Sequence, residues 1–278
     1  MRYLLLGLVF GVSLWACGLE REVEIELPAY EAQVVVEAYL EPGNRYNLLL
    51  TRGTPFFDPF DIQSLETVLE EVLEQEADVR IRYGNQEISL VNNLYYNPST
   101  QQFANYVAQE IVPYDYTAEF NLEIMLQNGK EIDATTYLLK PIPFDSLVVE
   151  YQDDTLARVL TYLTDIPREE NFYRRMLSVG SLDSVPEQDF LVEDILTDNG
   201  VIAFGTGFDY TKGDKVINSL WHISKEYYDF LESVQFSIQA NLDPITQPGM
   251  IISNVNGSAN PLGIFTGISL SRDTTNIE

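Results

Sequence analysis

The chain has 278 residues, with 43 acidic against 16 basic side chains and a formal net charge of −27 at pH 7. A surface of this sign argues against nucleic-acid binding, which needs a basic footprint, and against lying flat on an anionic membrane. The length allows one or two domains with their own hydrophobic cores, and a single cysteine excludes a disulfide framework.

The first 16 residues are predicted to be a lipoprotein signal peptide. Arg2 precedes an uncharged apolar run at 4–14, which is too short to span a bilayer but suits an export signal. The sequence Leu-Trp-Ala-Cys that ends at Cys17 resembles the lipobox of bacterial lipoproteins. This resemblance implies cleavage before Cys17 and its lipidation, which would hold the protein at a membrane. The alternative is an ordinary secretory signal followed by an incidental cysteine.

Residues 17–32 are glutamate-rich. Val23, Ile25 and Leu27 alternate with glutamates, which is a strand-like period. We therefore expect either a lipidated tether or an edge strand. The glutamates after Cys17 also resemble the export signal that directs lipoproteins of Bacteroidota to the cell surface.

Residues 33–140 are predicted to form an N-terminal β-sandwich domain. A hairpin opens it, with strands at 33–40 and 46–52 joined by a Pro-Gly turn. The period changes at 61–75, where apolar residues recur every three to four positions, as in an amphipathic helix packed on a core. Further strands are predicted at 78–83, 87–91, 103–109, 116–126 and 132–139, with turn signals at Gly84-Asn85 and Asn128-Gly129.

The stiff segment Pro141-Ile-Pro143 is predicted to be the domain boundary. Residues 141–278 then form a C-terminal β-rich domain, in which 181–200 is expected to be a long polar excursion and Ser224 to cap an amphipathic helix that ends near Ser237. Its strands are predicted at 147–151, 157–163, 172–179, 201–204, 216–223, 251–255 and 264–271. The predicted fold is thus mainly β, with two β-sandwich-like domains that each carry an amphipathic helix.

Several segments together resemble one protein family. They read CGLEREVEIELP, VVVEAYLEPG, LTRGTPFFD, NGKEIDATTYLLKPIPFDSL, ENFYRRML and NPLGIFTGISLSR. In this order they are similar to the DUF4249 family of outer-membrane lipoproteins of Bacteroidota. Genes of that family often lie beside TonB-dependent receptors, so the resemblance implies an accessory role with such a receptor in nutrient uptake. It supplies no functional residues.

A second resemblance concerns modification. Asp followed by Ser or Thr and then a hydrophobic residue or Thr is similar to the O-glycosylation motif of Bacteroidota. Four candidate acceptors fit it: Ser146, Thr155, Ser184 and Thr274.

No catalytic residue, cofactor site or metal site is predicted. His222 is the only histidine and no Gly-x-Ser-x-Gly elbow is present, so a serine triad lacks its usual signature. We expect His222 to be structural. One histidine also excludes a His-rich zinc site. Oxygen ligands for calcium could come from a polar set without EF-hand spacing, namely Asp194, Asp198, Asn199, Asp209 and Asp214.

Three functions stay open. The first is a non-catalytic accessory or ligand-binding partner of a TonB-dependent receptor, and the second is a structural or adhesive surface lipoprotein. The third is a hydrolase that would use paired carboxylates such as Asp153 and Asp154 or Glu169 and Glu170. Candidate partner contacts are the loops at 181–200 and 242–249 and the aromatic segment Phe56, Phe57 and Asp58, which could instead pack into the core.

Overall fold

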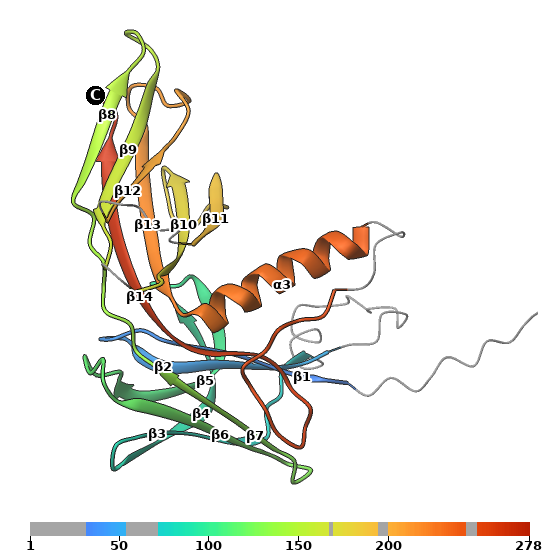
Figure 1. The fold of residues 1–278 in the computed structure, drawn as a ribbon. Coiled ribbons are helices and arrows are strands. Elements are labelled where there is room, and N and C mark those ends of the chain that lie inside the picture. Colours follow the sequence, from blue (N-terminus) through green and yellow to red (C-terminus); the bar gives the residue numbers. More distant parts are fainter. Residues whose placement is uncertain (1–31, 54–71, 167–168, 194–199, 243–248) are drawn as a thin grey trace, which may run out of the picture. The chain divides into compact units, whose positions relative to one another are not determined.

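The fold is mainly β, with a single helix among the residues that the structure describes (Figure 1). The computed structural model describes residues 32–53, 72–166, 169–193, 200–242 and 249–278. Its strands form an eleven-stranded sheet of order β11-β10-β13-β14-β1-β2-β5-β4-β3-β6-β7 and a three-stranded sheet of order β12-β9-β8. The elements in chain order are β1 (Val34–Leu40), β2 (Arg45–Arg52), β3 (Ala77–Tyr83), β4 (Gln86–Asn97), β5 (Gln102–Ile111), β6 (Glu119–Leu126), β7 (Glu131–Tyr137), β8 (Ser146–Tyr151), β9 (Ala157–Thr164), β10 (Phe172–Val179), β11 (Gln188–Glu193), β12 (Val201–Gly205), β13 (Lys215–Ile223), α3 (Lys225–Leu242) and β14 (Leu262–Asn276).

Alternation of buried and exposed residues is clearest in strands β6 and β7 of the first half. In β7, for example, Ile132, Ala134 and Thr136 are buried while the residues between them are exposed, because successive strand side chains point to opposite faces. Strands β1 to β7 enclose one hydrophobic core, to which β1 contributes Val36 and Leu40. Glycines with positive φ, Gly84 and Gly129, lie in the two predicted hairpin turns.

The last strand, β14, joins the two halves of the chain. Its first six residues pair in parallel with β1, from Val35 opposite Leu262 to Leu40 opposite Gly267. Its remaining nine residues pair antiparallel with β13, from Ile268 to Asn276. One strand of 15 residues, about 50 Å long at strand rise, therefore belongs to both halves of the eleven-stranded sheet.

In the second half, the two sheets pack on each other. One cluster combines Leu163 of β9 and Phe204 of β12 with Tyr173 of β10 and Leu220 of β13. The faces of the two sheets that carry these residues therefore lie against each other.

Arg175 of β10 lies fully buried in this second core. Its Nε donates to Asn218 Oδ1 at 3.2 Å, and one terminal nitrogen donates to Gln188 Oε1 at 3.3 Å. The guanidinium also lies over the rings of Phe190 and Phe204, at 5.6 and 5.1 Å from their centroids. Burial lowers the pKa of Arg175 to about 10, since removal from water disfavours the charged form.

Helix α3 begins directly after the predicted cap. The Tyr227 amide donates to Ser224 Oγ at 3.2 Å, which satisfies one of the free amides of the first turn. Tyr227 and Phe230 are buried against β10, β13 and β14. The helix runs to Leu242, five residues beyond the predicted end. No helix in the described ranges is long and apolar enough to cross a membrane.

Two predictions about secondary structure are wrong. The polar excursion at 181–200 contains strand β11, which pairs with β10 because Phe190 and Val192 supply apolar side chains to the second core. Residues 251–255 form no strand. Asn254 instead bonds the backbone of Phe265 through its side chain, with Nδ2 donating to the carbonyl and Oδ1 accepting from the amide.

Two further predictions remain open. The helix at 61–75 falls mostly outside the described residues. The boundary at Pro141 to Pro143 stays a prediction: the eleven-stranded sheet continues across it, and residues 32–278 form one compact unit.

The side chain of a buried asparagine bonds backbone groups of neighbouring segments in the first half. Asn105 of β5 accepts from the Leu50 amide at 2.8 Å and donates to the carbonyls of Leu50 at 3.1 Å and Glu74 at 2.8 Å. The Leu50 carbonyl also accepts from the Glu74 amide at 3.0 Å. The Asn105 side chain therefore holds β2 to β5 and to the segment before β3.

We expect Asn105→Ala to lower the free energy of unfolding by about 2–4 kcal/mol, because the Leu50 amide and the Glu74 carbonyl lose the side chain that they bond. Asn93→Ala on β4, which changes an exposed asparagine, is the matched control and should change it by no more than about 0.5 kcal/mol. Chemical denaturation measures both, and equal losses would contradict the role given to Asn105.

Candidate functional site

The strongest sequence-based site residues fall outside the described part of the chain. These are Cys17, the predicted lipidation site, and the segment Phe56, Phe57 and Asp58. The four candidate glycosylation residues are all exposed, namely Ser146, Thr155, Ser184 and Thr274. Their modification stays a prediction.

His222 of β13 is held in place on both sides. It is buried, its Nδ1 lies 2.8 Å from the Lys140 carbonyl oxygen and its Nε2 lies 3.2 Å from Asn171 Oδ1. Burial lowers the pKa of His222, against the raising effects of the Lys140 carbonyl and of Asp165. The residue therefore links β13 to the segments that precede β8 and β10, as expected of a structural histidine.

Two of the remaining polar candidates serve turns. The Asp153 carboxylate accepts from Thr155 and from the Leu156 amide, and Asp214 accepts from Thr211. Asp194, Asp198 and Asn199 lie outside the described residues. Within the described ranges, no three His, Cys, Asp or Glu side chains gather as metal ligands would.

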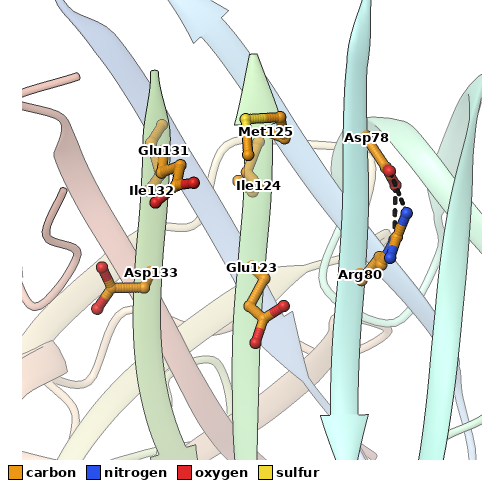
Figure 2. A pocket seen from close by; sticks show the side chains of 8 residues that line it. All are labelled: Asp78, Arg80, Glu123, Ile124, Met125, Glu131, Ile132 and Asp133. Atoms are coloured by element: carbon orange, nitrogen blue, oxygen red, sulfur yellow. Dashed lines mark hydrogen bonds and ion pairs between the residues drawn. The ribbon is translucent and has the colours of Figure 1, made fainter. Parts of the chain in front are cut away.

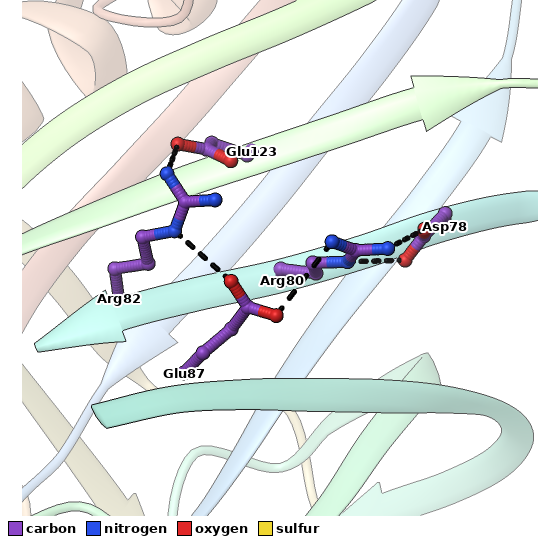
Figure 3. Close-up of polar contacts among 5 residues, drawn as sticks. All are labelled: Asp78, Arg80, Arg82, Glu87 and Glu123. Atoms are coloured by element: carbon purple, nitrogen blue, oxygen red, sulfur yellow. Dashed lines mark hydrogen bonds and ion pairs between the residues drawn. The ribbon is translucent and has the colours of Figure 1, made fainter. Parts of the chain in front are cut away.

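A chain of alternating charges crosses the outer face of β3, β4 and β6, and we call it the charge ladder (Figure 3). Glu87 lies between two arginines, 3.6 Å from Arg80 and 3.1 Å from Arg82. Arg82 also reaches Glu123 at 2.6 Å, and Arg80 pairs with Asp78 on its own strand. These side chains are 41–50% exposed, so the ladder fixes the side-chain arrangement of a surface and adds little stability.

A shallow cavity of about 450 Å³ lies beside the ladder, on β3, β6 and β7 (Figure 2). Besides ladder residues, it is lined by Met125 and by the carboxylates of Glu131 and Asp133. Neither of these two acids forms an ion pair with another described residue. The cavity therefore carries net negative charge.

Large apolar side chains are exposed on the neighbouring strands of the same sheet. Val91, Leu94 and Tyr96 of β4 and Phe103 of β5 are 42–60% exposed, and we call them the β4–β5 patch. Tyr96 and Phe103 pair across the strands with ring centroids 5.2 Å apart. A β-bulge between Asn92 and Tyr95 interrupts the pairing. Bulges commonly re-aim side chains, and exposed apolar clusters mark contact surfaces.

The comparisons with known proteins identify the family. A family model described as "Domain of unknown function (DUF4249)" matches residues 20–274. The chain belongs to the DUF4249 family. No curated protein matches this DUF4249 chain. A solved structure described as "Cytokine receptor complex - Crystal form 1A" is similar at 8% identity and a TM-score of 0.27, over 86% of this chain and 94% of the other.

The charge ladder of this DUF4249 protein could have been predicted from the sequence, but the β4–β5 patch could not. Arg80 and Arg82 alternate with Ile81, and Glu87 follows across the Gly84-Asn85 turn, so the hairpin register alone places Arg82 opposite Glu87. Val91 and Tyr96 are residue types usual in core strands, but both are exposed: Val91 alternates with the buried Leu90, and Tyr96 follows the bulge.

Glu87→Gln removes the carboxylate that both ladder arginines share. We expect a lower thermal midpoint than for Glu131→Gln, which changes an unpaired acid of the same face, because the two variants lose equal charge but only the first loses ion pairs. The difference should vanish at about 0.5 M salt, where exposed pairs are screened. Calorimetry at low and high salt measures it, and a difference that persists in salt would contradict this account.

Proposed function

We propose that this DUF4249 protein is a lipid-anchored, non-catalytic binding protein of the outer membrane, exposed at the cell surface, that assists a TonB-dependent receptor in nutrient uptake. Cys17 carries the anchor, and residues 17–32 connect it to the folded part. Family membership supports the receptor as partner, because the family resemblance implies genes beside such receptors. The lipobox-like sequence before Cys17 supports the anchor.

The observation that carries the proposal is the β4–β5 patch. Four large apolar side chains are exposed on adjacent strands, and two of them, Tyr96 and Phe103, are in ring contact. Exposed apolar clusters often mark protein contacts. The charge ladder of the same sheet would supply a polar rim around this apolar centre, which is the usual anatomy of a protein interface. Tyr96 and Phe103 are the side-chain types expected at its energetic centre.

A binding role rather than catalysis is favoured by what the candidate groups already do. His222 uses both ring nitrogens in structural contacts, and the Asp153 carboxylate caps a turn. Catalytic acids and bases need positions from which they can reach a substrate.

The proposal includes two sandwich-like halves, residues 33–140 and 141–278, each with an amphipathic helix. Two hydrophobic clusters that lie wholly in the second half support this division. The partner would then contact the loops of the second half and the sheet face of the first half.

We expect Cys17→Ala to abolish incorporation of a fatty-acid analogue and to release the protein from the membrane fraction, because no other anchor is predicted. Metabolic labelling followed by fractionation measures both effects. The wild-type protein is the control, and a labelled variant would contradict the lipid anchor.

We expect Phe103→Ser to reduce co-purification of the receptor at least ten-fold without lowering thermal stability. The reason is that its ring is exposed in the folded protein and would be buried only in the complex. Mild-detergent purification from the membrane, with quantification of the receptor, measures the effect.

Phe236→Ser on α3 is the matched control, because it changes another exposed phenylalanine. It should leave receptor recovery unchanged. Equal recovery with both variants would reject the patch as the contact, and wild-type protein that recovers no receptor would reject the receptor as partner.

A further inference from the structure

A second cavity, of about 320 Å³, lies between β1 and helix α3. Its lining includes alternate residues of β1, namely Val35, Glu37 and Tyr39. The helix contributes mainly apolar side chains, and Arg174, Gln102, Ile251, Leu262 and Gly263 complete the lining, so we call this space the α3 pocket. An apolar cavity of this size with a few polar groups is typical of a small-molecule site.

Two tyrosines lie at the polar end of the α3 pocket. The rings of Tyr39 and Tyr227 have centroids 5.3 Å apart, and the Tyr39 hydroxyl donates to Glu37 Oε2 at 2.9 Å. Burial raises the pKa of both tyrosines, so both hydroxyls are neutral at physiological pH. The tyrosine rings and the carboxylate therefore lie together at one end of the pocket.

The charges of the pocket do not cancel. Arg174 is paired with Asp189 through two contacts at 2.8 and 2.6 Å, so its positive charge is already balanced. Glu37 is half-buried and forms no ion pair with any described residue. One negative charge therefore remains without a cation.

One more polar atom in the lining lacks a partner. The side-chain oxygen of Gln102 is buried without a hydrogen bond. Tyr227 is fully buried, and its hydroxyl lies beside Tyr39 and Arg174, with oxygen lone pairs that can still accept from a ligand. Unpaired buried polar atoms are costly in a folded protein, and a ligand that donates hydrogen bonds at this point would satisfy them.

We propose that the α3 pocket binds a small organic amine, with its ammonium group between Glu37, Gln102 and Tyr227 and its apolar part against Phe230, Leu231 and Val234. The ammonium supplies three donors, which match one carboxylate, one amide oxygen and one hydroxyl oxygen. It also supplies the positive charge that Glu37 lacks, and the tyrosine rings favour a nearby cation.

An anionic ligand is disfavoured for the same reasons. Its carboxylate would meet Glu37 in a pocket whose only cation is already paired, within a chain of net charge −27. The field of such a chain raises the local concentration of cations and lowers that of anions.

The test compares three probes of similar shape but different charge: 2-phenylethylamine, 2-phenylethanol and 3-phenylpropionate. Calorimetric titration of the full-length protein in a non-ionic detergent should show the amine binding at least about ten-fold more tightly than the alcohol, because an ion-paired hydrogen bond is worth at least that factor. The carboxylate should bind most weakly. Equal affinity for amine and alcohol would overturn the proposal.

Variants locate the site. Glu37→Gln keeps an acceptor for Tyr39 but removes the charge, and should weaken amine binding about ten-fold. Glu131→Gln, the matched control on the outer face, should bind like the wild type. Val234→Phe fills the pocket and should abolish binding, which decides the question if Glu37→Gln fails to fold. Unchanged affinity in both pocket variants would overturn the proposal.

A lysine side chain of a partner protein carries the same ammonium group. N-acetyl-lysine amide, titrated in parallel, separates the two sources: tighter binding of this probe than of 2-phenylethylamine would overturn the assignment to a small amine. The inference rests on the proposed function only in treating the protein as a binding protein. Amine titration and receptor co-purification are separate measurements, so one can fail while the other succeeds.

Discussion

The parallel pairing of β1 with β14 is the contact on which the rest of the described structure depends. It requires β14 to approach its neighbours more closely than a side chain permits. A Cβ at Gly263 would lie 1.8 Å from the Val36 carbonyl oxygen, and one at Gly267 would lie 2.1 Å from that of Tyr137. The Gly267 amide also donates to Thr136 Oγ1 at 3.1 Å. Two glycines thus let one strand contact β1 and β7 together.

This pairing gives β1 two covered faces. Val36, Ala38 and Leu40 point into the core of the first half, and the alternate residues Glu37 and Tyr39 line the α3 pocket. The same strand therefore closes a hydrophobic core and forms the floor of a polar-ended cavity. Because α3 packs on β10 and β14, the geometry of that cavity is set by the junction of the two halves.

Local patterns predicted most strands, and tertiary contacts explain what they missed. Alternation was sufficient for β7, and Ser224 was sufficient for the start of α3. Parallel pairing of the first and last described strands leaves no local mark in the sequence. Local sequence also does not predict which residues line a site. Arg174 and Arg175 are adjacent on β10, so their side chains point to opposite faces: Arg174 lines the α3 pocket, and Arg175 lies in a core. Arginines are usually exposed.

The position of β14 also has a kinetic consequence. A chain that emerges with its N-terminus first exposes one edge of β1 until its final strand arrives, and an unpaired edge is a template for wrong pairing. Contacts between distant segments also form slowly, because the loop between them must close first. Folding should therefore complete only after synthesis of the whole chain. Until then, the β1 edge stays open to wrong pairing.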